Sequence, residues 1–275
     1  MDKDINRIFS LSYTEAKNIV VCGDIHGDFN KLIYKMCVQY QMKDTLLVVA
    51  GDCGFGFEQK GYYENIVRQN SKRMNEANNW IVFVRGNHDN PAYFDGVTFK
   101  HKRMIAVPDY SVINACGHHM LCVGGAISID RSFRIKEWNR RKFIFSKSYN
   151  QDDLLARNLY WPDEQPVLDK TQLSLINQSY KIDLIVTHTA PSFCELIVKN
   201  NLDYWVNVDD SLLIDMKKER EVMTQLYEYL VENGHPITNW CYGHFHQSWH
   251  SSINGIMFSM LDIMEFKSGF DYRQI

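Results

Sequence analysis

The sequence contains no apolar run long enough to cross a bilayer, because polar residues interrupt every stretch of Val, Ile, Leu and aromatic residues. The first residues, "MDKDINRIFSLSYTEAKN", also lack the apolar core that a secretory signal needs. We therefore expect a soluble, cytoplasmic protein without a membrane partner.

Neither sign of charge is in clear excess. The 30 Lys and Arg residues against 33 Asp and Glu residues give a net charge of -3 and a pI near 6.4. No global positive field therefore indicates nucleic acid or an anionic membrane as a partner. A local basic patch stays open, so nucleic acid remains a candidate substrate that the net charge does not support.

Cysteine is present without a pattern. The seven cysteines are odd in number and none has CxxC spacing, which argues against a disulfide framework and against a structural zinc site. We expect most of them to be reduced, buried and apolar in behaviour. They are Cys22, Cys37, Cys53, Cys116, Cys122, Cys194 and Cys241.

Short apolar runs recur along the 275 residues, and each ends at a polar loop that often contains glycine. Runs such as "NIVVCGDIHGD" and "TLLVVAGDCG" are typical of strands buried on both faces. Helical patterns lie between several of them, at residues 28–41, 58–78, 167–180 and 209–232. Strands that alternate with helices predict an α/β fold.

Three segments differ from this alternation. Residues 105–127 predict two antiparallel strands around a turn at Gly117, and "SMLDIMEF" near the end predicts another strand. Residues 128–166 have few apolar runs, and we interpret them as a cap or insertion within a single domain of residues 1–275. Their basic residues form either a solvated face or an anion-binding surface. These are Arg131, Arg134, Lys136, Arg140, Arg141, Lys142 and Lys147.

Side chains that bind metals or transfer protons follow the strand-like runs. They are Asp24, His26, Asp52, Asn87, His88, His188, His244 and His246. One such residue after a strand is usually structural, but this repeated placement at the same ends of strands is hard to explain by packing. Burying so many ionisable groups at one edge is costly unless a cation pairs with them. His244 and His246 lie two residues apart, so in an extended segment both imidazoles reach one point.

Glycines stand immediately before four of these residues, at Gly23, Gly51, Gly86 and Gly243. Glycine permits sharp backbone turns, so we expect these four to aim the following side chains inward.

The ordered blocks "GDIHG", "GDCG", "GNHD", "TH" at Thr187 and His188, and "GHFH" resemble the five signature blocks of the calcineurin-like metallophosphoesterase superfamily. The match extends from residue 19 to about residue 262. "GGAISIDRSFR" and "YWPDEQP" further resemble bacterial and phage-type members whose substrates are mostly undefined. The resemblance implies an α/β/β/α sandwich of two mixed sheets with flanking helices and a dinuclear metal centre at one edge.

The family pattern also implies a role for each candidate residue. Asp24, His26 and His246 would hold the first divalent ion, Asn87, His188 and His244 the second, and Asp52 would bridge them. The implied reaction is hydrolysis of a phosphate mono- or diester by a hydroxide that bridges the ions, with His88 assisting the leaving group. Imidazole-rich ligation favours Mn, Fe, Zn, Ni or Co over Mg or Ca, and all five stay open.

The second block departs from one branch of the superfamily. The protein Ser/Thr phosphatases carry "GDxVDRG" there, whereas this chain has "GDCGFGF" without the arginine that binds phosphate. Arg85, before "GNHD", occurs in both patterns. A protein-phosphatase role is weakened, although Arg131 or Arg134 could supply the missing cation and bind substrate.

Two alternatives to a small-molecule phosphoesterase remain. A nuclease would need an open groove lined by basic and aromatic residues, which Trp138, Trp161 and the basic segment leave open. A catalytically silent scaffold on the same fold should have lost ligands or the histidine after Asn87. All seven ligand positions and His88 are present, which favours the enzyme.

Overall fold

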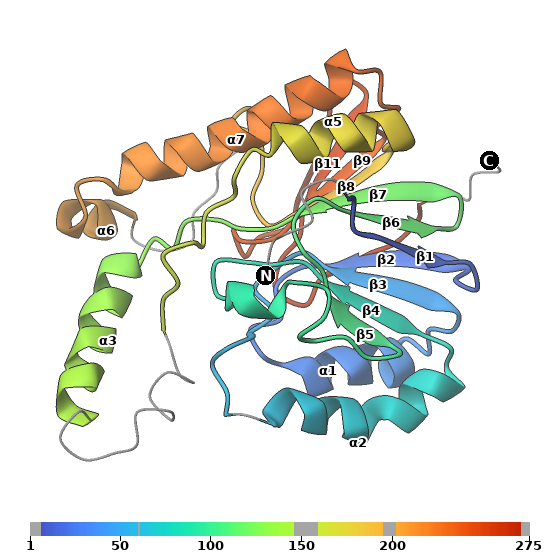
Figure 1. The fold of residues 1–275 in the computed structure, drawn as a ribbon, viewed down its shortest axis with the longest axis horizontal. Helices are drawn as coiled ribbons and strands as arrows, with labels where there is room; N and C mark the ends of the chain where they lie inside the picture. Colours follow the sequence, from blue (N-terminus) through green and yellow to red (C-terminus); the bar gives the residue numbers. More distant parts are fainter. Residues whose placement is uncertain (1–6, 60, 146–158, 195–201, 271–275) are drawn as a thin grey trace.

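Two β-sheets packed face to face, with helices on both outer sides, form the centre of the molecule (Figure 1). The structure is a computed structural model that describes residues 7–59, 61–145, 159–194 and 202–270.

The smaller sheet contains the first three strand-like runs of the sequence. Its strands are β2 (Asn18–Cys22), β3 (Thr45–Val49), β4 (Trp80–Phe83), β5 (Met104–Ala106) and β12 (Phe266–Lys267). The spatial order is β12-β2-β3-β4-β5, with the β12–β2 pair antiparallel and the others parallel. All five residues of β3 are buried, as expected for a central strand that is covered on both faces.

The larger sheet combines the predicted hairpin with the later strands. Its members are β1 (Ser10–Tyr13), β6 (Ser111–Ala115), β7 (His118–Val123), β8 (Leu184–Thr187), β9 (Asn239–Tyr242), β10 (Trp249–Ile253) and β11 (Ile256–Met260). The order is β1-β6-β7-β8-β9-β11-β10, and β7, β8 and β9 run parallel. Cys116 and Gly117 join β6 to β7 with φ of 50° and 78°, which is typical of a two-residue type I′ turn. The predicted hairpin is therefore confirmed.

Helices cover the outer face of each sheet (Figure 1). The helices of the described residues are α1 (Phe29–Tyr34), continued by a π-helix (Lys35–Gln39), α2 (Tyr62–Glu76), a 3-10 helix (Pro91–Tyr93), α3 (Arg131–Phe145), α5 (Lys170–Ser179), α6 (Leu202–Val208) and α7 (Leu212–Glu232). Helices α1 and α2 lie against the smaller sheet, and α5 and α7 lie against the larger one. The four helical predictions fall on α1, α2, α5 and α7.

The hydrophobic core has three layers because each central strand is apolar on both sides. In β2, Val20 and Cys22 pack toward α1 and α2, whereas Ile19 and Val21 pack toward the other sheet. Trp240 of β9 belongs to the third layer, beneath α7. Two mixed sheets between helices confirm the predicted α/β/β/α sandwich.

The end of the chain differs from the prediction. "SMLDIMEF" is strand only at its two ends, since β11 finishes at Met260 and β12 starts at Phe266. The residues between them lead the chain from one sheet to the other. Strands β1 and β10 were not predicted, because these edge strands are only partly buried and lack a continuous apolar run.

The basic segment at 128–166 contains α3, which stands with α6 to one side of the sandwich (Figure 1). Lys147 of this segment lies outside the described residues. Among the helices that the structure describes, none has both the length and the apolar character that a bilayer crossing requires.

Phe55, in the loop after β3, lies at the centre of an aromatic cluster under α1 and α2. Its ring is fully buried and its centroid lies 4.9–5.4 Å from those of Phe29, Phe83 and Phe99. We expect Phe55→Ala to lower the free energy of unfolding by about 3–5 kcal/mol, because it leaves a cavity in a packed core. Denaturant unfolding would measure this. Phe133→Ala, at a side chain that is 57% exposed on α3, is the matched control and should change stability by less than about 0.5 kcal/mol. Equal effects of the two changes would contradict the central role of Phe55.

Candidate metal centre

Five loops converge at the edge of the sandwich where parallel strands of both sheets end. Asp24 and His26 follow β2, Asp52 follows β3, Asn87 and His88 follow β4, His188 follows β8, and His244 and His246 follow β9. The carboxyl ends of parallel strands are where α/β folds collect ligands. All eight predicted site residues therefore lie in one region, and each sheet contributes some of them.

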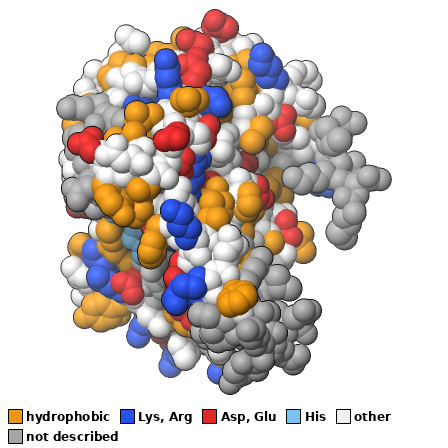
Figure 2. Space-filling model, turned by 90° about the vertical axis from the view of Figure 1, so that its left-hand side faces the viewer, with side chains coloured by type: hydrophobic (Ala, Val, Ile, Leu, Met, Phe, Trp, Pro, Cys, Tyr) orange, Lys and Arg blue, Asp and Glu red, His pale blue; other side chains and the backbone are white. Residues whose placement is uncertain are grey.

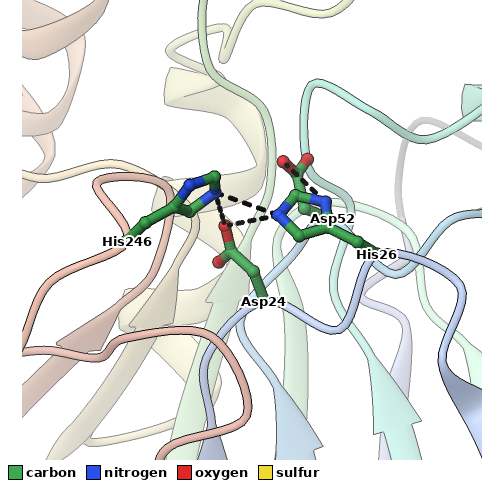
Figure 3. Close-up of side chains that lie close together, drawn as sticks. All are labelled: Asp24, His26, Asp52 and His246. Carbon is green, nitrogen blue, oxygen red and sulfur yellow. Dashed lines mark hydrogen bonds and ion pairs between the residues drawn. The ribbon is translucent and has the colours of Figure 1, made fainter. Parts of the chain in front are cut away.

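Four of these side chains form a first group (Figure 3). One ligand atom from each of Asp24, His26, Asp52 and His246 lies within 4.8 Å of the others. The Nε2 atom of His246 is 2.9 Å from Asp24 Oδ2 and 3.0 Å from His26 Nε2. Atoms from separate loops thus surround one point.

A second group lies beside the first. Asn87 Oδ1 is 2.9 Å from His188 Nε2 and 3.0 Å from His244 Nδ1. Asp52 stands between the groups, with Oδ1 at 3.2 Å from His188 Nε2 and Oδ2 at 3.9 Å from His26 Nδ1. Each oxygen of this carboxylate therefore faces a different group.

The first group fits a cation better than it fits a network of hydrogen bonds. Asp24 Oδ2 is buried and has no hydrogen-bond partner within the described part of the chain, although His246 lies close to it. His26 and His246 present nitrogen to nitrogen, so one of the two lone pairs is unsatisfied unless a proton or a cation lies between them. Imidazole and carboxylate donors directed at one point are typical of a transition-metal site.

A hydrogen bond to the backbone orients the His188 ring. Its Nδ1 donates a hydrogen bond to the Ala50 carbonyl oxygen at 2.7 Å, so in the neutral ring the Nε2 lone pair faces the second group. Burial lowers the pKa of His188, but the Asp52 and Asp24 carboxylates raise it to about 10. The ring therefore lies in a strongly negative potential, which divalent cations would neutralise.

The centre opens to solvent on one side. The side chains of His26 and His246 are 31% and 28% exposed, whereas those of Asp24 and His188 are fully buried. A substrate would approach from the side of the two exposed imidazoles.

The backbone at the centre is strained. His26, Asp52, His244 and His246 have φ of 45°, 46°, 69° and 51°, in the left-handed region that residues with a side chain seldom adopt. Such conformations cost about 1–3 kcal/mol each and persist where the surrounding structure imposes them, often at functional sites.

Three of the four glycines serve a purpose other than the predicted turn. Gly51, with φ of 95°, has a left-handed conformation that suits a sharp turn. Gly23, Gly86 and Gly243 do not, and here the requirement is space, because a Cβ atom would overlap the Asp262 carbonyl oxygen, Asp52 and Asp24, respectively. Gly86 and Gly243 thus let backbone approach the buried carboxylates.

Asp89, which sequence reasoning did not single out, joins the second and third blocks. Its carboxylate accepts hydrogen bonds from the backbone N–H groups of Cys53, Gly54, Phe55 and Gly86. Burial and the nearby Asp52 raise its pKa to about 6, against these four donors. Its place in "GNHD" was the only available signal, since its partners lie more than thirty residues away in three of the four cases.

His88 lies at the mouth of the centre and contacts α3. Its backbone N–H donates to Asp52 Oδ1 at 2.8 Å, and its ring Nδ1 is 3.3 Å from a terminal guanidinium nitrogen of Arg134. Burial lowers the pKa of His88 to about 4, with the Arg134 charge acting in the same direction and the Asp52 carboxylate opposing it. Because Arg134 can only donate, Nδ1 accepts, and the ring proton belongs on Nε2.

Arg131 and Arg85 have other partners. Arg131 donates to both oxygens of Asp209, to Asp215 and to Ser211, which ties α3 to the start of α7. The Arg85 guanidinium donates to Asp109 and to the carbonyls of residues 163–165. The structure thus brings Arg134 to His88, and it gives Arg131 and Arg85 contacts within the protein.

Comparisons with known proteins agree with this geometry. A family model described as "Calcineurin-like phosphoesterase" matches residues 17–248. The solved structure of TT1561 from Thermus thermophilus is similar with a TM-score of 0.53 and 11% sequence identity, covering 92% of this chain and 98% of that one. At this identity the likeness shows a shared fold.

Two other solved structures are more distant. A dimetal phosphatase from Danio rerio has 9% identity and a TM-score of 0.46, covering 90% of this chain and 87% of that one. The phosphopantetheinyl hydrolase of Mycobacterium tuberculosis has 12% identity and a TM-score of 0.37, covering 92% and 96%. Curated proteins gave no significant match.

The contacts of Arg131 predict a structural effect. We expect Arg131→Met to lower the free energy of unfolding by about 1–3 kcal/mol, because it leaves the Asp209 carboxylate without its cation and Asp215 with Lys218 alone. Arg140→Met, at an exposed residue paired with Glu137 on the same helix, is the control and should leave the free energy of unfolding nearly unchanged. A wild-type stability for Arg131→Met would show that the tie between α3 and α7 is unimportant.

This effect should depend on pH in one direction. The hydrogen bonds from Arg131 hold the pKa of Asp209 well below its ordinary value. The stabilisation is therefore complete above the unfolded-state pKa of about 3.9 and is lost as the pH falls through the lowered value. Unfolding curves should bring wild type and Arg131→Met together in acid and separate them at neutral pH.

Proposed function

The chain belongs to the calcineurin-like phosphoesterase family, whose members bind two divalent metal ions, and from this premise we propose that it hydrolyses a phosphate mono- or diester at a dinuclear metal centre. One observation supports this proposal more strongly than the rest. Two groups of imidazole, carboxylate and amide donors lie side by side with the Asp52 carboxylate between them, one oxygen toward each.

Each proposed ion would take ligands from one group. The first would be held by Asp24, His26 and His246, the second by Asn87, His188 and His244, and Asp52 would bridge them. The imidazole-rich donor set favours Mn, Fe, Zn, Ni or Co. Two carboxylates against two divalent ions leave a positive centre, which suits an anionic ester.

When bound, such a pair of ions supplies a nucleophile near neutral pH by lowering the pKa of water and neutralises charge on the phosphoryl oxygens. His88 would assist the leaving group. Its Nδ1 is engaged by Arg134, so Nε2–H is the group that can donate a hydrogen bond to an ester oxygen.

We propose Arg134 as the cation that contacts the substrate phosphate. Its guanidinium is held by Asp130 at 2.7 Å and by the Leu159 carbonyl, and one of its terminal nitrogens lies 3.3 Å from His88 Nδ1. Arg131 is the weaker candidate, because Asp209, Asp215 and Ser211 already accept its hydrogen bonds. On this view the 128–166 segment is a cap within one domain, and α3 carries the substrate-binding residue.

The two alternatives gain less support. A silent scaffold has no need of strained backbone at four ligand positions or of a buried carboxylate with one oxygen that accepts no hydrogen bond from the described residues. For a nuclease, the face that carries α3 and α6 shows basic, acidic and hydrophobic side chains interspersed rather than a continuous basic band on its described part (Figure 2). The seven free thiols, most of them buried, are compatible with the proposed cytoplasmic location.

The proposed reaction can be tested with p-nitrophenyl phosphate and bis(p-nitrophenyl) phosphate. We expect protein stripped of metal to be inactive and reconstitution with Mn²⁺ to restore hydrolysis of at least one substrate. His88→Ala should retain its metal and lose about 10²- to 10⁴-fold in kcat, because it removes the donor to the leaving group. His250→Ala, at a histidine outside the centre, should keep full activity. Silence of the wild type with both substrates while both ions are bound would favour the scaffold.

The role of Arg134 predicts a separate kinetic effect. Arg134→Ala should raise KM for the anionic ester by about 10-fold or more, since a charge-assisted hydrogen bond to phosphate contributes about 1.5–3 kcal/mol. Steady-state kinetics of Arg134→Ala and Arg140→Ala, two arginines of the same helix, would measure it. An unchanged KM in Arg134→Ala would exclude substrate contact by this residue.

A further inference from the structure

Two segments outside the five signature blocks meet behind the second ligand group. They are "GGAISIDRSFR" at 124–134 and "YWPDEQP" at 160–166. Ser128 from the first and Glu164 from the second are 2% and 0% exposed; Ser128 contacts Asn87, and Glu164 contacts Ser128. Neither Ser128 nor Glu164 belongs to the ligand groups or to the proposed substrate contacts.

A chain of hydrogen bonds links the three side chains. Asn87 Nδ2 donates to Ser128 Oγ at 2.9 Å, and Ser128 Oγ donates to Glu164 Oε2 at 2.5 Å. The backbone N–H of Ser128 donates to the other carboxylate oxygen, Oε1, at 2.9 Å. Both oxygens of the Glu164 carboxylate are thus directed at Ser128.

The direction of this chain determines which way the Asn87 amide points. In its ionised form the Glu164 carboxylate can only accept, so the Ser128 hydroxyl proton is then committed to Glu164 and the hydroxyl lone pair is left to accept. Only the NH₂ group of Asn87 can donate to that lone pair. The carbonyl oxygen must then face the other way, toward His188 and His244, where it lies.

We infer that Glu164, acting through Ser128, is a positioning residue that fixes the Asn87 amide with its oxygen toward the second metal ion, an inference that rests on the proposed dinuclear function. The opposite orientation would direct an NH₂ group, which has no lone pair for a metal, at the ion. Outer hydrogen bonds of this kind commonly control the affinity of a metal site.

Glu164 itself is held firmly. Arg85 donates to the carbonyl oxygens of Asp163 and Glu164, and the Ala126 N–H donates to the Glu164 carbonyl at 3.0 Å. Arg85 stands two residues before Asn87 in the chain. The arginine that precedes "GNHD" therefore fixes the segment that orients the asparagine within the same block.

The charge of Glu164 is subject to two opposed influences. Burial raises the pKa of this carboxyl to about 8, while its hydrogen bonds from Ser128 lower it. Divalent cations beyond Asn87 would favour the ionised form, which is the form that accepts from the hydroxyl.

The loop around Ser128 has independent anchors, which makes the inference testable. The Ile127 N–H donates to Glu219 Oε2 at 2.5 Å, and the Ala126 N–H donates to the Glu164 backbone carbonyl. Ser128→Ala removes the hydroxyl and leaves both anchors in place. Glu164→Gln keeps the size of the side chain but replaces one acceptor by a donor. The backbone N–H and the hydroxyl of Ser128 can then no longer each donate to a separate oxygen of this side chain.

The experiment is a titration of the metal-free full chain with Mn²⁺, followed by calorimetry and by the electron paramagnetic resonance spectrum. Wild type should bind two ions and give the spectrum of an exchange-coupled pair. Ser128→Ala and Glu164→Gln should bind the first ion as wild type does and the second about 10- to 100-fold more weakly. At metal concentrations that fill both sites of wild type, the two variants should therefore give the spectrum of an uncoupled ion. Ser259→Ala removes a buried hydroxyl that has no hydrogen-bond partner among the described residues, and as the control it should resemble wild type.

Three results would overturn the inference. Wild-type binding of both ions by the two variants would show that the hydrogen-bond chain has no effect on Asn87. Equal weakening of both ions, with a fall in Tm larger than that of Ser259→Ala, would indicate a merely structural role. Failure of the wild-type chain itself to bind two ions would refute the dinuclear centre first, and the inference with it.

Discussion

The burial of two carboxylates, Asp24 and Asp52, at the joint between two sheets is the constraint on which the rest of the structure depends. Neither side chain has appreciable contact with solvent, and one oxygen of Asp24 lacks a hydrogen bond from the described residues. Buried negative charge of this kind is tolerated only with compensating positive charge close by. The surrounding imidazoles, and the raised pKa of His188, are the response of the chain to this requirement.

The scaffold has to bring many polar side chains into a small volume without losing its core. Parallel strands achieve this because their carboxyl ends coincide, so that loops far apart in sequence deliver side chains to one edge. The cost appears as left-handed backbone at His26, Asp52, His244 and His246. Three apolar layers, together with the four hydrogen bonds that Asp89 accepts from the loops, hold these conformations in place.

The fold class and the eight converging residues could be predicted from sequence because strand runs and the polar residues after them are local patterns. Edge strands β1 and β10 could not, since their half-exposed residues carry no strong periodicity. Nor could sequence separate Arg131 from Arg134. Both are basic, three residues apart on one helix, and only the position of that helix decides that one meets Asp209 and the other His88.

Each proposed ion would have ligands from both sheets. The first would be bound by Asp24 and His26 of the smaller sheet and by His246 of the larger one. The second would be bound by Asn87 of the smaller sheet and by His188 and His244 of the larger one. Metal bonds would therefore cross the same joint that the middle apolar layer fills. The ions would then hold the two sheets together. The distance between the reacting groups would depend on how far one sheet can slide past the other. The same metal bonds would therefore determine both how firmly the two sheets are joined and how the reacting groups are arranged.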